Sequence, residues 1–217
     1  MNRAIWVVRH AEREDNVNEN WEKLPGARDL KPDNTMLSER GRQQARECGA
    51  RFRDIKIANV FASPYDRTIE TASTIVAGKN LLVKAEPGLC ESLHHCEDPP
   101  SFWDVAKLKL KYPLIDANYA PVYSKRQLPR MEFGDPACIP RIRYTITRLT
   151  QRYTDDLLFV SHGGPIACIH KIWHDQYIHV GQATISKFVE VEKGKFRLEF
   201  SGDCRHLSDR TNLRPYL

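Results

Sequence analysis

Two short apolar runs, far apart in the chain, each end on a histidine. The first is Ala4–Val8, followed by Arg9 and His10, and the second is Leu157–Ser161, followed by His162. Runs of this length and composition are typical of buried strands and are too short to cross a bilayer. Ligands of open α/β sheets bind at the carboxyl ends of the strands. The sequence therefore predicts two strands that deliver polar side chains to one binding edge.

Strand patterns alternate with helical patterns through most of the chain. Further strands are predicted at 57–61 and 81–85, helices at 38–52, 64–76, 102–112, 140–153 and 165–174, and a closing hairpin over 184–200. This alternation predicts an α/β fold, specifically a three-layer α/β/α sandwich with a mostly parallel central sheet. At 217 residues we expect one domain, 1–217, and we interpret the weakly patterned segment of about 92–136 as an insertion that caps the substrate.

The distribution of charged residues and of cysteines indicates the class of ligand and the cellular compartment. The net charge is +5, but basic and acidic residues are interleaved, which favours an acidic ligand such as a phosphate over a nucleic-acid groove. The six cysteines include no C-x-x-C pair, so we expect reduced, mostly buried thiols. Because neither a secretory leader nor a membrane-spanning run is recognisable, we expect a cytoplasmic protein with no membrane partner.

Three arginines are predicted to lie near the two histidines. Arg9 ends the first strand, Arg13 follows shortly after it, and Arg67 falls in the first turn of a predicted helix. The planar guanidinium matches the oxygens of a phosphate and keeps its charge, and His162 adds a further donor. These residues are therefore predicted to bind a phosphoryl group.

The same edge of the predicted sheet also carries candidates for the nucleophile and for the general acid. A neutral imidazole is nucleophilic near neutral pH, and neighbouring arginines disfavour its protonated form, so His10 is the candidate nucleophile. Glu91, on the loop after the predicted strand 81–85, is the candidate acid for the leaving oxygen. One histidine at a strand end is more often structural than catalytic, but two of them with three arginines favour a phosphate site.

Four motifs resemble the histidine phosphatase (phosphoglycerate mutase-like) superfamily and occur in that family's order. They are Val8–Arg13, Leu37–Gly41, Phe61–Arg67 and Val160–Gly163. Within the family, the segments 83–89 and 115–119 look similar to the phosphatase domain of the suppressors of T-cell-receptor signalling and to ecdysteroid-phosphate phosphatases.

The resemblance implies roles for these residues. It implies that His10 becomes phosphorylated, that Glu91 acts as the acid and later as the base, and that no metal or other cofactor is needed. It assigns the phosphoryl group to Arg9, Arg67 and His162, with Arg13 assisting. It also favours a homodimer.

We therefore predict a phosphomonoester hydrolase that forms a phosphohistidine and acts on phosphotyrosine or on an aromatic or steroid-like phosphate. Its partner would be a phosphorylated small molecule or a phosphotyrosine protein. One alternative is a phosphoglycerate-type mutase, with Lys125, Arg126 or Arg130 binding the substrate carboxylate. The other is a phosphate-binding adaptor with weak catalysis, because Ala11 stands where the family usually has glycine.

Other histidines invite a metal assignment. His170 and His174 are spaced i, i+4 on a predicted helix, but no glutamate accompanies them as in an H-E-x-x-H motif. The pair His94 and His95 is interpreted as part of a solvated loop. The sequence therefore predicts no metal site.

Overall fold

A six-stranded mixed sheet forms the centre of the computed structural model, which describes residues 3–216. Its strands are β1 (Ala4–Arg9), β2 (Asn59–Ala62), β3 (Val83–Ala85), β4 (Leu157–Ser161), β5 (Ile185–Glu192) and β6 (Lys195–Asp203). Their order is β3-β2-β4-β1-β5-β6. The first four strands in this order are parallel, and β5 and β6 form the predicted antiparallel hairpin. The predicted α/β fold with a mostly parallel sheet is confirmed.

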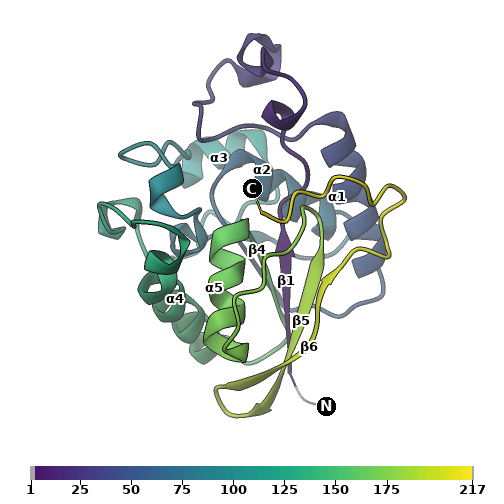
Figure 1. Cartoon of the computed structure of the whole chain (residues 1–217), viewed down its shortest axis with the longest axis vertical. Coiled ribbons are helices and arrows are strands. Elements are labelled where there is room, and N and C mark those ends of the chain that lie inside the picture. The colour runs from purple at the N-terminus through teal and green to yellow at the C-terminus, as the bar shows by residue number, and fades with distance from the viewer. Residues whose placement is uncertain (1–2, 217) are drawn as a thin grey trace.

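Helices cover both faces of the sheet (Figure 1). One face packs against α1 (Glu39–Phe52) and α2 (Asp66–Val76), and the other against α4 (Ile139–Arg152) and α5 (Gly163–His174). Successive residues of a strand point to opposite faces, so Val8 joins the cluster with α1 and α2 while Val7 joins the cluster with α4 and α5. These are the three layers that the sequence predicts.

The central pair of strands determines where the two histidines lie. β1 and β4 pair in parallel with Arg9 opposite Ser161, and the backbone N–H of His10 donates to the carbonyl oxygen of Ser161 over 3.0 Å. His10 and His162 therefore leave the sheet side by side, at the carboxyl edge.

α1 is fixed at its first turn by two local features. The Ser38 hydroxyl caps the helix by accepting a hydrogen bond from the Gly41 N–H over 2.9 Å. A Cβ at Gly41 would lie 2.1 Å from the carbonyl oxygen of Glu12, so only glycine permits this approach. The helix thereby packs directly against the segment that follows His10.

Several predicted boundaries are wrong. The helix predicted at 102–112 is α3 (Val105–Lys111), because Asp104 caps it and the Ser101 hydroxyl instead donates to Asp33. α2 begins two residues after Pro64, and β3 covers only part of the strand predicted at 81–85.

Within residues 3–216, the connections contain seven short 3-10 helices. They are η1 (Glu14–Asn16), η2 (Trp21–Lys23), η3 (Pro25–Ala27), η4 (Pro87–Leu89), η5 (Leu93–His95), η6 (Lys125–Gln127) and η7 (Asp135–Cys138). Within residues 3–216, no helix combines the length and the apolar character needed to span a bilayer. The six cysteines are free thiols, and four of them are buried.

Candidate active site

His10 and His162 face each other at the carboxyl edge of the sheet. Their ring centroids are 5.3 Å apart, and both side chains are buried. Nδ1 of His10 lies 2.8 Å from the carbonyl oxygen of Ala11, which can only accept, so Nδ1 carries the proton and Nε2 keeps its lone pair. Burial and the charges of Arg67 and Arg9 hold the pKa of His10 well below its usual value. The geometry therefore presents a neutral imidazole with a nucleophilic Nε2.

Ala11 fits this turn without backbone strain. Its side chain is fully buried in the cluster with α1 and α2, and its backbone is not among those with positive φ. The Ala11 N–H also donates to the hydroxyl of Thr71 over 3.2 Å. The backbone and the surrounding cluster therefore accommodate an alanine here.

Arg9 lies beneath the N-terminus of α5. Its Nη1 donates to the carbonyl oxygens of Val180 and Arg214, each over 2.7 Å. A Cβ at Gly163 would lie 3.2 Å from Cζ of Arg9, so this glycine leaves room for the guanidinium. Burial lowers the pKa of Arg9, and the nearby carboxylate of Glu91 partly opposes that shift.

Arg67 comes from the first turn of α2 and is almost fully buried. Its Nη1 donates to the carbonyl oxygen of Asp33 over 2.9 Å, and its guanidinium lies 4.7 Å from the ring centroid of Tyr65. Nε of Arg67 has no hydrogen-bond partner among the described residues. A buried donor of this kind is costly unless a ligand accepts from it. Arg67 therefore offers a donor ready for an anion.

Arg13 lies farther out and is already engaged. Its guanidinium is paired with the carboxylate of Asp15, and Nε also lies 3.2 Å from the hydroxyl of Thr35. Arg13 lines a cavity together with Arg67 and Glu91, and its charge contributes to the lowered pKa of His10. Arg13 thus acts on His10 through its charge, although its guanidinium is already paired with the carboxylate of Asp15.

His162 lies between Ser63 and Glu91, and these neighbours decide which ring nitrogen carries the proton. Nε2 lies 2.7 Å from the hydroxyl oxygen of Ser63, and Nδ1 lies 3.6 Å from Oε2 of Glu91. Nδ1 is buried without a hydrogen-bond partner among residues 3–216. Burial and the charge of Arg67 lower the pKa of His162, so the ring is neutral. A Ser63 hydroxyl that donates to Nε2 leaves the proton on Nδ1, which makes this atom a second donor ready for an anion.

Ser63, which orients His162, was not predicted as a site residue. It follows β2 within the motif Phe61–Arg67, and its side chain is fully buried. Its position directly after a buried strand could have predicted this role, because it places Ser63 on the same edge of the sheet as His10 and His162.

The backbone of Glu91 is held by Arg141, a buried residue that was not predicted as part of the site. Arg141 of α4 donates to the carbonyl oxygens of Gly88, Cys90 and Glu91 over 2.9 to 3.1 Å. Nε and Nη2 of Arg141 also form a two-pronged pair with Glu132, over 2.8 and 2.7 Å. The loop that carries Glu91 is therefore fixed by the helix behind it.

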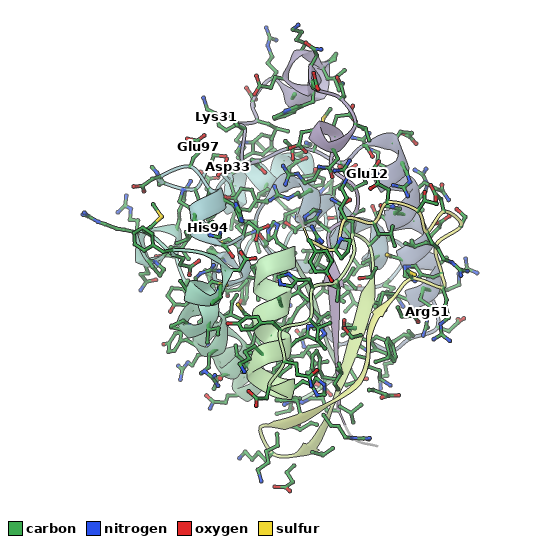
Figure 2. The ribbon with its side chains drawn as sticks, in the orientation of Figure 1. Glu12, Lys31, Asp33, Arg51, His94 and Glu97 are labelled. Atoms are coloured by element: carbon green, nitrogen blue, oxygen red, sulfur yellow. The ribbon has the colours of Figure 1, made fainter. Side chains whose placement is uncertain are left out.

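A cavity of about 500 Å³ adjoins the site, with Arg13, Arg67 and Glu91 on its wall. His10 and His162 are not among the described residues that line it. Its lining residues are Arg13, Asn16, Pro32, Asp33, Arg67, Glu91, His95, Asp135, Gly163, Gly164, His179, Pro215 and Tyr216. Figure 2 shows Asp33 in the upper left of the molecule with Lys31 and Glu97, and His94 below them beside the upper end of α5. The cavity is larger than a phosphate needs and has rings on its outer wall. The basic residues Lys125, Arg126 and Arg130 are not among the described residues that line it.

The histidines of α5 have structural surroundings. His170 is buried, with Nδ1 2.9 Å from the carbonyl oxygen of Ile166 and Nε2 2.9 Å from the hydroxyl of Ser201. His174, one turn later, is exposed. The i, i+4 pair thus does not converge on a shared ligand.

Comparisons with known proteins agree with this architecture. The family model described as histidine phosphatase superfamily (branch 1) matches residues 5–203. No curated protein matches the sequence.

Solved structures with the same fold include enzymes of more than one activity. The ecdysone phosphate phosphatase from Bombix mori is 18% identical, with a TM-score of 0.68 and 98% of each chain covered. A mycobacterial glucosyl-3-phosphoglycerate phosphatase is 18% identical, with a TM-score of 0.63 and coverage of 93% of this chain and 99% of that one. The phosphoglycerate mutase from Bacillus anthracis is 19% identical, with a TM-score of 0.65 and 94% of each chain covered. At these identities the likeness is one of fold. The family model covers most of the chain, and the chain therefore belongs to branch 1 of the histidine phosphatase superfamily.

Proposed function

We propose that this protein hydrolyses phosphate monoesters through a phosphohistidine formed on Nε2 of His10. The observation that carries the proposal is the state of this imidazole: Nδ1 donates to the carbonyl of Ala11, and burial beside the arginines lowers the pKa, so Nε2 is unprotonated. A neutral nucleophile surrounded by fixed cations suits attack on an anionic phosphoryl group.

The first step forms the bond between Nε2 of His10 and phosphorus while the ester P–O bond breaks. Arg9, Arg67 and Nδ1 of His162 bind the non-bridging oxygens, with Arg13 assisting. The proton that the leaving oxygen needs comes from Glu91, 3.6 Å from His162.

The second step returns the site to its starting state. Glu91, now a carboxylate, takes a proton from water as the water oxygen attacks phosphorus and the P–N bond breaks. The products are inorganic phosphate and neutral His10. No step uses a metal.

The shape of the cavity supports an aromatic phosphate as substrate. Phosphate fills only part of about 500 Å³, and the outer wall carries the rings of His95, His179 and Tyr216. Rings of this kind pack against a flat apolar leaving group. We therefore propose phosphotyrosine or a steroid-like phosphate, on a small molecule or a protein. Lys125, Arg126 and Arg130, which a mutase would need to bind a carboxylate, are not among the described residues lining the cavity.

Turnover of para-nitrophenyl phosphate with a metal chelator present tests the reaction. The native chain and His174→Ala, which changes an exposed histidine, should hydrolyse the ester, whereas His10→Ala should not. An acid-labile, base-stable radiolabel on the native chain, absent from His10→Ala, would identify the phosphohistidine. A native chain inert across the acid and neutral range, or full activity of His10→Ala, would overturn the proposal.

A comparison of substrates tests the specificity. Phosphotyrosine and an aromatic steroid phosphate should give a higher kcat/KM than 3-phosphoglycerate or glycerol phosphate. The reverse order would reject the aromatic substrate class while leaving the phosphohistidine step in place. We also propose a cytoplasmic location, which six free thiols support.

A further inference from the structure

Two imidazoles and a carboxylate gather at the rim of the cavity, outside the groups that act on phosphorus. Nε2 of His94 lies 3.9 Å from Oδ1 of Asp135, and Nε2 of His95 lies 3.8 Å from the same oxygen. One donor atom from each of the three side chains lies within 4.8 Å of the others. The histidines come from η5 and the aspartate from η7, 40 residues later in the chain. We propose that these three residues bind a zinc ion.

One oxygen of the Asp135 carboxylate has no hydrogen-bond partner among the described residues. This atom, Oδ1, is also buried from solvent. Both imidazole nitrogens are too distant for a hydrogen bond to it. On its other side the oxygen abuts Gly164, where a Cβ would lie only 2.5 Å away. A buried carboxylate oxygen left in this state is costly unless a cation pairs with it.

The spacing of the donors suits a small tetrahedral ion. Zinc binds nitrogen and oxygen at about 2.0 to 2.1 Å, which places two tetrahedral ligands about 3.3 Å apart. The two separations from histidine to aspartate, 3.8 and 3.9 Å, therefore need to shorten by only about half an ångström. The two imidazoles already lie together, with ring centroids 3.7 Å apart.

The segments that carry these ligands are tied to one buried ion pair. The Leu93 N–H donates to Oε2 of Glu132 over 3.0 Å, and Glu132 is paired with Arg141. Glu132 lies three residues before Asp135, so the same carboxylate anchors η5 and the approach to η7. The site is thus partly organised before the ion binds, which lowers the entropy lost on binding.

The donor set selects the kind of ion. Calcium and magnesium prefer oxygen ligands, whereas two imidazole nitrogens with one carboxylate are typical of zinc. Three protein ligands leave a fourth position open, and His95 and Asp135 line the cavity together with Glu91. The open position therefore faces the space that a substrate enters. Zinc there would neutralise Asp135, add positive charge at the rim, and tighten the binding of inorganic phosphate.

Competition with a chromophoric zinc chelator tests the site directly. The native chain should bind one zinc ion, and Asp135→Asn and His95→Asn should each bind it at least about 10- to 100-fold more weakly. His174→Ala is the matched control and should bind like the native chain. Cobalt added in place of zinc should give the visible absorption of a four-coordinate ion in the native chain and lose it in Asp135→Asn. Thermal unfolding without metal, with the same midpoint in each variant, shows that the variants fold.

The outcomes separate this site from the catalytic histidines. His10→Ala should keep its zinc affinity, and loss of binding in that variant would place the ion between His10 and His162 and overturn the proposal. Unchanged binding in Asp135→Asn, or no binding by the native chain at micromolar zinc, would also overturn it. These measurements need no turnover, so they stand apart from the test of phosphate hydrolysis. Only the tighter binding of inorganic phosphate with zinc rests on the proposed function.

Discussion

The hydroxyl oxygen of Ser63 lies 2.7 Å from Nε2 of His162, on the side of the ring opposite Glu91. A hydroxyl that donates to Nε2 fixes the tautomer with the proton on Nδ1, which is the nitrogen facing Glu91. The serine thus sets which hydrogen-bonding group His162 offers to a phosphoryl oxygen.

Replacing Ser63 with alanine should weaken binding of the transition state. The net value of one hydrogen bond predicts a loss in kcat/KM of about 2- to 10-fold and a similar rise in the inhibition constant of vanadate. Ser73→Ala removes a hydroxyl of α2 that has no hydrogen-bond partner among the described residues, and it should change neither value. Full activity of Ser63→Ala would show that this hydroxyl does not orient the ring.

Arg67→Lys should impair catalysis strongly although the charge is retained. Lysine cannot donate to the carbonyl of Asp33 and also present a fork to a phosphate, and Nε of Arg67 is the donor left for that ligand. We expect kcat/KM for para-nitrophenyl phosphate to fall by about 10²- to 10³-fold, the usual effect of losing one transition-state donor. Arg126→Lys, at an exposed position, is the control. A loss below tenfold would mean that Arg67 serves mainly as a point charge.

Arg141→Met should affect stability and the acid step in separable ways. Removing one partner of a buried pair leaves Glu132 without its cation and should cost about 3 to 5 kcal/mol in the free energy of unfolding. The double variant Arg141→Met/Glu132→Leu should recover much of that loss, as measured by urea unfolding. Both variants should hydrolyse substrate more slowly than the native chain. The reason is that the carbonyls of Gly88, Cys90 and Glu91 lose their donor, so the loop that carries the acid is no longer fixed.

The leaving group shows whether Arg141 positions the acid. Phenyl phosphate needs its leaving oxygen protonated far more than para-nitrophenyl phosphate does, so kcat should fall more for phenyl phosphate. Equal losses on the two esters would assign Arg141 a purely structural role.

The buried histidines predict lower stability in acid. The pKa values of His10 and His162 are held below the usual 6.5 in the folded chain, so below pH 6.5 the unfolded chain binds more protons. The free energy of unfolding should therefore be insensitive to these two groups above pH 6.5. It should fall with decreasing pH by up to about 1.4 kcal/mol per pH unit for each histidine.

Urea unfolding between pH 7.5 and 5.5 measures this dependence. His10→Ala should flatten the slope, and His174→Ala, which changes an exposed histidine, should leave it unchanged. If His10→Ala keeps the native slope, His10 is not held neutral in the folded chain.

Local signals account for the parts of the fold that the sequence predicts. β1 and β4 are marked by apolar runs, and α1 by Ser38 at its N-cap, because strand burial and helix capping depend on a few neighbouring residues. The register of β1 on β4 then brings His10 beside His162. The start of α3 does not follow from local signals, since Ser101 and Asp104 are equally good caps and a distant carboxylate, Asp33, decides between them.

Long-range contacts account for what the sequence did not predict. Arg141 has the spacing of a helical residue and nothing in its neighbourhood indicates that it binds a loop 50 residues earlier. Likewise Asp135 meets His94 and His95 only because the segment between them folds back onto itself. Pairings of this kind depend on tertiary packing, which periodicity and capping rules do not describe.

The pairing of Arg9 with Ser161 also bears on how thermal fluctuations of the native state affect the site. β1 and β4 are the two middle strands of the sheet, and the N–H of His10 is hydrogen-bonded between them. We expect such an amide to exchange with solvent only when the central strands open, and therefore more slowly than the amides of the connecting loops. The arrangement of His10 and His162 should therefore persist as long as the fold itself. Fluctuations of the native state should change the access of substrate to this pair before they change the positions of the two rings.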